Sequence, residues 1–300
     1  MATTFSSLDL KLAADGLIAI PALVKRVDEF AAFSTQLKNS SALEGDTIQV
    51  PVYGLTAGAA AFDKTTNNYL TAGTDSATGV GVVLGAPIKQ TSLIPARYLP
   101  NLDLRAKMQD LANAVLQKCQ LNVYDSITAA TYGAAAFTGI ASTFDMTDII
   151  DLETSANDFN FGSDRVLVVS DAYLANVKKS DVLIALRNVS GGNGLDTFAE
   201  AAGFKLIGSN LIKSAAPALS ADNLVGFMTD KSCIAIAAAY PNVDGIGDPG
   251  VMIERTIING FPIQFRSFYD RSTDQLSLTA ECMFGFNKLR TGALKRLISA

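Results

Sequence analysis

Histidine and tryptophan are absent from the 300 residues of this chain. The missing histidine excludes the Ser-His-Asp and Cys-His arrangements of nucleophilic catalysis, imidazole acid–base chemistry and every metal site with a histidine ligand. Cysteine is scarce: Cys119, Cys233 and Cys282 are far apart and odd in number, so neither a disulfide framework nor a Cys-x-x-Cys ligand pair is expected. We expect three small, buried, apolar side chains in a reducing compartment.

Charge is also low, at 18% of residues against a usual ~25%, whereas 49% of the residues are hydrophobic. This composition argues against disorder of the whole chain and suffices for one or two buried cores. Little charge combined with much Ala, Gly, Ser and Thr is compatible with surface hidden against other subunits. It is equally compatible with a large, well-packed monomer.

Long apolar runs are missing too. The longest notable uncharged stretch, residues 126–144, contains Ser, Thr and Gly throughout and is too polar to span a membrane. Lys11, Asp15 and Lys25 interrupt the apolar residues near the N-terminus, so no secretory signal is expected. These features predict a soluble protein without a membrane partner.

Basic residues are outnumbered, and the net charge is −5. A protein that grips phosphates tightly usually has a basic excess. The C-terminal region is the exception, because Lys288, Arg290, Lys295 and Arg296 crowd together there. No Trp or Tyr is interleaved among them, so a nucleic-acid site is only weakly indicated. A solvated surface, or salt bridges to an acidic neighbouring subunit, fits the same residues.

Two patterns resemble functional sites. Residues 245–250 spell G-x-G-x-x-G, but no strand clearly leads in and no helix follows to receive a pyrophosphate, so a turn is favoured. Asp145, Asp148, Asp151 and Glu153 gather at a predicted helix start, where the helix dipole favours negative charge without a metal. We therefore expect no catalytic residue, cofactor or metal, and predict that the chain is not an enzyme.

The N-terminal third predicts an arm followed by a hairpin. Residues 1–44 indicate an arm with a short helix, and strand-like runs follow at residues 47–53 and 80–84. Of the 28 residues from Gly54 to Gly81, 18 are Gly, Ala, Ser or Thr. We interpret residues 45–96 as a long two-stranded excursion, with a disordered surface loop as the alternative. A lone hairpin is marginal in water, so it must lean on its own domain or on a neighbouring chain.

Residues 101–132 have the clearest helical pattern, with Asn101 as the expected cap. About 30 residues at 1.5 Å each predict a spine of about 45 Å. Its apolar stripe, at spacings of three and four, consists of Leu104, Met108, Leu111, Val115, Cys119, Val123 and Ile127.

The next hundred residues alternate between helix and strand signals, which predicts a compact α/β unit. The expected elements are a helix capped at Asp145 or Thr147, a buried strand at 165–169, a helix through Lys179, strands at 204–207 and 224–228, and a last helix from Asp230 through Ala239. The glycine-rich loop at 190–194 is expected to be mobile.

Residues 251–286 predict a three-stranded antiparallel meander. Asn259-Gly260 marks its first turn and residues 270–274 its second. From Leu276 to Phe286 every second residue is apolar or small, which forms a face that needs the long helix as its partner. The chain would then return to its first domain, and the α/β unit would be an insertion.

This order of segments resembles the major capsid proteins of tailed bacteriophages, whose fold is the Hong Kong 97 type. The similarity is one of layout over essentially the whole chain, with local matches at GDTIQVP (45–51), RVLVVS (165–170) and from Gly285 to Arg296. It implies an α+β chain. Its parts would be an N-terminal arm (1–44), an extended loop (45–96), a peripheral domain with a spine helix (97–144), an axial domain (145–248), and peripheral return strands with the C-terminus (249–300).

By this resemblance the chain would assemble with itself, as hexamers and pentamers, into the icosahedral head shell around double-stranded DNA. Portal and scaffolding or decoration proteins would be further partners, and packaged DNA would make weak non-specific contact. Assembly would take place in the host cytoplasm, and the product would be the virion. Expected subunit contacts are Phe62, Lys64, Tyr69 and Leu70 in the extended loop, Asn193 in the axial loop, and Arg290 and Arg296 in the C-terminal basic cluster.

Two alternatives stay open. One is an encapsulin-type nanocompartment shell with the same fold, and the other is an α/β enzyme with residues 145–240 as its catalytic domain. The missing histidine and the missing phosphate loop argue against the enzyme.

Overall fold

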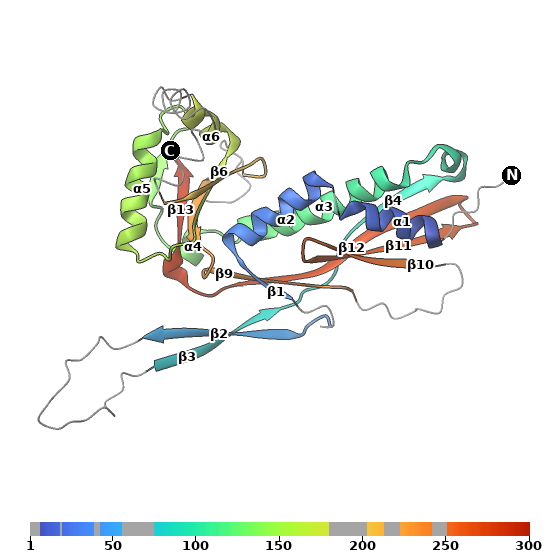
Figure 1. Ribbon diagram of the computed structural model, residues 1–300, viewed down its shortest axis with the longest axis horizontal. Helices are drawn as coiled ribbons and strands as arrows, with labels where there is room; N and C mark the ends of the chain where they lie inside the picture. Colours follow the sequence, from blue (N-terminus) through green and yellow to red (C-terminus); the bar gives the residue numbers. More distant parts are fainter. Residues whose placement is uncertain are drawn as a thin grey trace, which may run out of the picture.

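The computed structural model is an elongated body with a compact unit at one end and a two-stranded hairpin beneath it (Figure 1). Helices lie on one face of the main sheet, and the hairpin lies on the other (Figure 1). No helix in the described part of the chain is long and apolar enough to cross a membrane. The structure describes residues 7–18, 20–38, 43–55, 75–179, 203–212, 223–241 and 251–300.

The body is built on a six-stranded sheet around one long strand, β12 (Gln275–Lys288). On one side β12 pairs with β11 (Phe261–Asp270). On the other side it pairs with β4 (Ile88–Pro95), and its C-terminal part, from Met283 to Lys288, pairs with β9 (Ile234–Ala239). All three pairings are antiparallel, so β12 connects the whole length of the body.

Two further strands complete this sheet. β10 (Met252–Ile258) pairs with β11, and β1 (Thr35–Lys38) runs parallel to β9. The turn between β10 and β11 is Asn259-Gly260, and both residues have positive φ. The predicted meander of residues 251–286 is therefore confirmed, with its turn at the residues expected from the sequence.

Three helices supply the core on one face of the sheet. α1 (Ser7–Leu17) and α2 (Pro21–Phe33) pack on α3 (Leu104–Asp125), which in turn packs on β12 and β4. The rings of Phe30 and Phe261 stack with their centroids 5.9 Å apart. The expectation of an arm with one short helix is thus wrong for the described part of residues 1–44. That part holds two helices, because their apolar faces are buried in the main core.

The helix α3 is shorter than the predicted spine. Its N-terminal cap is Asp103, whose side chain accepts a hydrogen bond from the backbone N–H of Ala106 at 3.0 Å. Residues 96–101 form the 3-10 helix η1 (Ala96–Asn101), and Thr128 caps the separate helix α4 (Ala129–Tyr132). These competing caps limit α3 to 22 residues, or about 33 Å. The predicted stripe is confirmed from Met108 onward, because Met108, Leu111, Val115, Cys119, Val123 and Ile127 are all buried.

A five-stranded sheet forms the compact unit, in the order β5 (Phe137–Gly139), β13 (Leu294–Ser299), β8 (Leu224–Asp230), β6 (Arg165–Ser170) and β7 (Lys205–Ser209). Its strands β6 and β8 are buried on both faces. Leu167 and Val169 point into the core of the unit, whereas Val168 and Phe227 point into the main core. This explains the nearly continuous apolar run predicted for β6.

Two helices cover the outer face of this second sheet. α5 (Met146–Asp158) is capped by Asp145, one of the two predicted caps, and α6 (Asp171–Lys178) follows β6 directly. Asp145 and Asp148 form a capping box, each accepting a backbone hydrogen bond from the other end of the first turn.

The predicted helix from Asp230 to Ala239 is wrong. The carboxylate of Asp230 accepts hydrogen bonds from Gly162 and Ser232, which makes a turn, and the chain continues as strand β9. The alanines of β9 read as helix formers, but they are needed in a strand that is covered on both faces. Ala235, Ala237 and Ala239 face the hairpin, whereas Ile234 and Ile236 face the main core.

The two sheets exchange strands across the predicted domain boundaries. β9, within residues 145–248, lies in the main sheet, and β13, within residues 249–300, lies in the second sheet. Leu294 and Leu297 of β13 are fully buried, so the C-terminal strand closes the compact unit after the short 3-10 helix η2 (Thr291–Ala293). The domain boundaries stay predictions.

Candidate subunit-contact surface

The hairpin is the most extended feature of the molecule (Figure 1). Its strands β2 (Thr47–Leu55) and β3 (Asp75–Val83) are antiparallel, with Thr47 opposite Val83 at the base and Leu55 opposite Asp75 at the far end. The two-stranded excursion predicted from the sequence is confirmed for these residues. The expected loop contacts Phe62, Lys64, Tyr69 and Leu70 lie outside the described residues.

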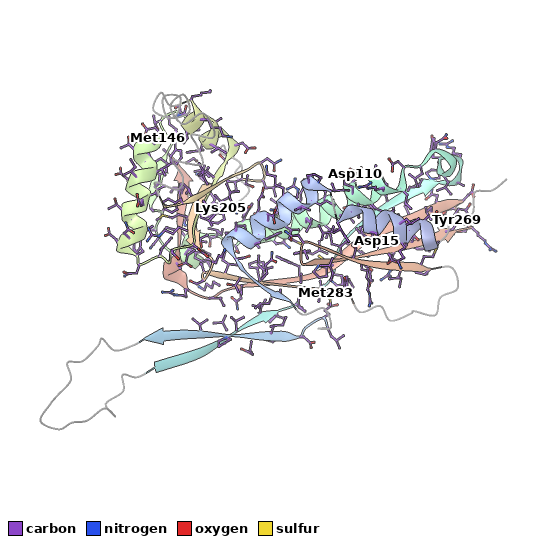
Figure 2. All side chains as sticks on the ribbon, in the orientation of Figure 1. Asp15, Asp110, Met146, Lys205, Tyr269 and Met283 are labelled. Carbon is purple, nitrogen blue, oxygen red and sulfur yellow. The ribbon has the colours of Figure 1, made fainter. Side chains whose placement is uncertain are left out.

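The base of the hairpin is held by a small apolar cluster of its own. Val82 and Leu84 are fully buried against the alanines of β9 and against Met283. Figure 2 labels Met283, which lies between the main sheet and the hairpin. Ile48 and Val50 of β2 pack on the same cluster. Only small side chains on β9 allow the hairpin to approach this closely.

Two hydrogen bonds to backbone carbonyls fix this approach. The N–H of Gly85 donates to the carbonyl of Phe284 at 3.2 Å, and the side-chain amide of Asn287 donates to the carbonyl of Gly81 at 2.7 Å. Between these two bonds, Gly285 has no room for a side chain, because the carbonyl of Val83 fills that space. The hairpin is therefore anchored at one crossing on β12.

Beyond this anchor, β2 and β3 run clear of the body (Figure 1). Pro51 and Gly79, a register pair halfway along the hairpin, are both exposed. Two paired strands without a further layer are marginally stable in water.

The sheet face on the hairpin side is open farther along. Leu93 of β4 and Phe268 of β11 flank Ser277 of β12 in one cross-strand row. Leu93 is 62% exposed and Phe268 is 40% exposed. Large apolar side chains on an uncovered sheet face are typical of contact surfaces.

A polar network follows on the same face. The carboxylate of Glu281 accepts hydrogen bonds from Arg266 at 2.8 Å and Gln264 at 2.9 Å, and Arg255 donates to Gln264 at 2.8 Å. Glu281 is 5% exposed, so its charge depends on these partners. This network fixes the positions of long side chains across three strands.

The two predicted contact residues of the C-terminus differ in their surroundings. Arg290 is exposed and donates to the hydroxyl of Ser232 at 3.4 Å. Arg296 is only 4% exposed, and its Nε and Nη2 atoms donate to the carbonyl of Gly133 at 3.1 and 2.9 Å. The expected contact Asn193 lies outside the described residues. Their role between subunits stays a prediction.

The acidic residues of α5 have a structural explanation. The N–H of Thr147 donates to Asp145 at 2.7 Å, and the N–H of Asp145 donates to Asp148 at 3.0 Å. Partial burial raises the pKa of Asp148. Among the described residues, no group of three or more cysteines and carboxylates is placed to hold a metal ion.

A second buried polar group joins α2 to α3. The side-chain amide of Gln120, which is fully buried, donates to Glu29 at 2.9 Å and accepts from Arg26 at 3.2 Å. Burial raises the pKa of Glu29 from its ordinary value of 4.5, although Gln120 and Arg26 oppose the shift. This group fixes the position of α2 on α3.

No family model and no curated protein matches this sequence. Solved structures do match it. The capsid of the cyanophage P-SCSP1u has a TM-score of 0.55 at 16% identity, over 89% of this chain and 86% of that one. The mature capsid of bacteriophage PhiM1 also has a TM-score of 0.55, at 12% identity over 90% and 86%. This chain has a phage-capsid fold. A virus-like particle from Pyrococcus furiosus matches as well, with a TM-score of 0.51 at 11% identity over 92% and 96%.

In this capsid fold, the anchor of the hairpin is what sequence reasoning missed. Gly285 was part of a matched segment, but its contact with Val83 joins residues that are far apart along the chain. A glycine inside an alternating strand is a signal of close backbone approach. The alternate alanines of β9 are a second signal of the same crossing.

Proposed function

We propose that this chain is the major capsid protein of a tailed bacteriophage and assembles with itself into the icosahedral head shell. The observation that supports this most strongly is the phage-capsid fold, which covers about nine tenths of the chain in each comparison. The role is structural, and we assign no catalytic residue or cofactor.

The hairpin is the part that we assign to contact between subunits. In this proposal its outer half, which runs clear of its own body, lies on an adjacent subunit. A stable interface buries about 1,200–2,000 Å² in total, and a projecting hairpin supplies area that a compact body does not. The open sheet face around Leu93 and Phe268 is the second proposed contact.

The compact unit would be the axial domain, whose tips gather at the five-fold and six-fold axes, with Asn193 in its contact loop. The C-terminal residues Arg290 and Arg296 are the remaining proposed contacts. Portal and scaffolding or decoration proteins would be partners, and packaged DNA would touch the shell weakly because the subunit is acidic overall. Assembly would take place in the host cytoplasm.

A nanocompartment shell is the second candidate function. The likeness to a virus-like particle from Pyrococcus furiosus favours it specifically. Such a shell would enclose protein cargo in place of a genome. Portal and terminase genes beside the coding sequence would favour the phage, and a cargo-enzyme gene would favour the compartment.

The test is the size of the expressed protein. We expect megadalton particles or capsomers in sedimentation velocity, and closed shells in negative-stain images. A monomer or small oligomer at every concentration and salt condition would contradict the shell proposal.

A further inference from the structure

Two of the three cysteines meet inside the main core. The sulfur atoms of Cys119 and Cys282 are 3.8 Å apart, and both side chains are fully buried. Cys119 lies on α3 and Cys282 on β12, which are 163 positions apart along the chain. Cys233 is engaged elsewhere, because its thiol donates to the carbonyl of Arg290 at 3.2 Å. The proposed shell function does not use this pair.

We propose that Cys119 and Cys282 are a latent cross-linking site, which forms a disulfide bond between α3 and β12 when the folded protein meets a peroxide. A disulfide requires the sulfurs to approach to about 2.05 Å. The proposal requires rotation of the two side chains and a small shift of α3 toward β12 to bring the sulfurs from 3.8 Å to this distance. Of the two core-facing neighbours of Cys282 on β12, Ala280 is small and leaves room for this shift, whereas Phe284 is a buried aromatic on the other side.

The pair stays reduced until a suitable oxidant reaches it. Burial raises the pKa of the Cys119 thiol well above its usual range, so reactive thiolate is scarce. Hydrogen peroxide is small and uncharged, and therefore suited to enter a packed core. One sulfur attacks the peroxide bond and becomes a sulfenic acid, and the released hydroxide takes up the thiol proton as water. The second sulfur displaces the hydroxyl group as a second water. Two thiols lose two electrons, and one peroxide gains them.

The bond would join the helix layer to the strand that connects the whole body. It would also close a loop containing most of the compact unit, and closing long loops restricts the unfolded chain most. A particle that leaves a reducing cell enters surroundings where such a bond persists. This biological setting depends on the proposed function, whereas the cross-link itself depends only on the fold.

The test uses the Cys233→Ala variant of the full chain, in which the two remaining thiols are those of the pair. After treatment of the folded protein with hydrogen peroxide, we expect both thiols to disappear from a titration in denaturant. Peptide mass spectrometry without reductant should show the peptides of Cys119 and Cys282 linked. The midpoint of thermal unfolding should rise by about 5 °C, and dithiothreitol should reverse the rise.

Cys119→Ala and Cys282→Ala are the controls, and each should show neither the link nor the rise. Circular dichroism checks whether these two control variants fold. If they do not fold, the linked peptide in the Cys233→Ala protein still tests the proposal. Two intact thiols, or oxygen addition without a linked peptide, would overturn the inference. Electron microscopy of the same samples separates the two ideas: particles without the link contradict only the cross-link, and the link without particles contradicts only the shell.

Discussion

The backbone carbonyl of Val83 occupies the space that a side chain at Gly285 would need. This contact presses the base of the hairpin against the central strand of the main sheet. The contact joins the projecting β2–β3 hairpin to β12, the central strand of the body. The body of the subunit therefore sets the direction of the hairpin.

Gly285→Ala is expected to separate the hairpin from β12, because the added carbon would overlap the carbonyl of Val83. The free energy of unfolding should fall by about 1–3 kcal/mol, as in other overpacked sites, and shells should form less. Urea unfolding and electron microscopy measure the two effects. Gly292→Ala is the control, since an added carbon there meets no atom within 4 Å. Equal stability of the two variants would show that the crossing is not tight.

Deletion of residues 56–78 should leave a folded subunit that does not close shells. Most of this segment lies outside the described residues, and the register of the remaining hairpin base from Thr47 to Pro51 is retained. Circular dichroism should show native secondary structure, and negative-stain images should show no closed particles. A Gly-Ser segment of equal length tests whether length alone suffices. Loss of folded structure in the deletion variant would mean that the segment supports its own subunit.

Leu111→Asp should unfold the subunit. Leu111 is 4% exposed in the core between α3 and the sheet, and an unpaired charge there should cost about 4 kcal/mol or more. Soluble expression and the circular dichroism spectrum report the outcome. Asp110→Asn, on the exposed side of the same helix, should be harmless. If the Leu111→Asp protein were soluble and formed shells, Leu111 could not lie in the core between α3 and the sheet.

Leu93→Asp should block assembly without unfolding the subunit. Leu93 is 62% exposed on the open sheet face, so its replacement should change the free energy of unfolding by no more than about 0.5 kcal/mol. Leu12, on α1, has the same 62% exposure and is the matched control. Sedimentation velocity compares both variants with the parent protein. Normal assembly of Leu93→Asp would remove this face from the proposed contacts.

Glu29→Gln should flatten the pH dependence of stability. Because burial raises the pKa of Glu29 in the folded state above 4.5, the folded protein binds more protons than the unfolded chain. This contribution to stability is full below pH 4.5 and decreases as the pH rises through the folded pKa. Lys25, Arg26 and Asp171 surround the same carboxyl group. Urea unfolding from pH 4.5 to 8 should show the variant gaining stability relative to the parent toward the upper end. If the free energy of unfolding changed with pH in the same way in the variant and in the parent, the raised pKa of Glu29 would be contradicted.

Elements with strong local signals were predictable from the sequence. The meander followed from strict alternation in β12 and from Asn259-Gly260, and the apolar stripe of α3 followed from its spacing. The hairpin followed from its lack of large side chains. These signals lie within a few residues of one another, so no knowledge of distant contacts was needed.

Elements defined by distant contacts were not predictable. Residues 234–239 are rich in alanine and favour a helix locally, but β1 and β12 recruit them as a strand. The C-terminal residues Lys295 and Arg296 read as a basic surface, whereas Arg296 is buried against Gly133. At the candidate contact surface, the projecting hairpin was foreseen and its anchor at Gly285 was not, because the partner lies in β3.

The most direct measurement is a cryo-electron microscopy reconstruction of the assembled protein. We predict a closed shell in which the outer half of each β2–β3 hairpin lies on a neighbouring copy and makes its contacts there. A reconstruction in which that half packs only on its own subunit, with no other copy touching it, would contradict the proposed role of the hairpin.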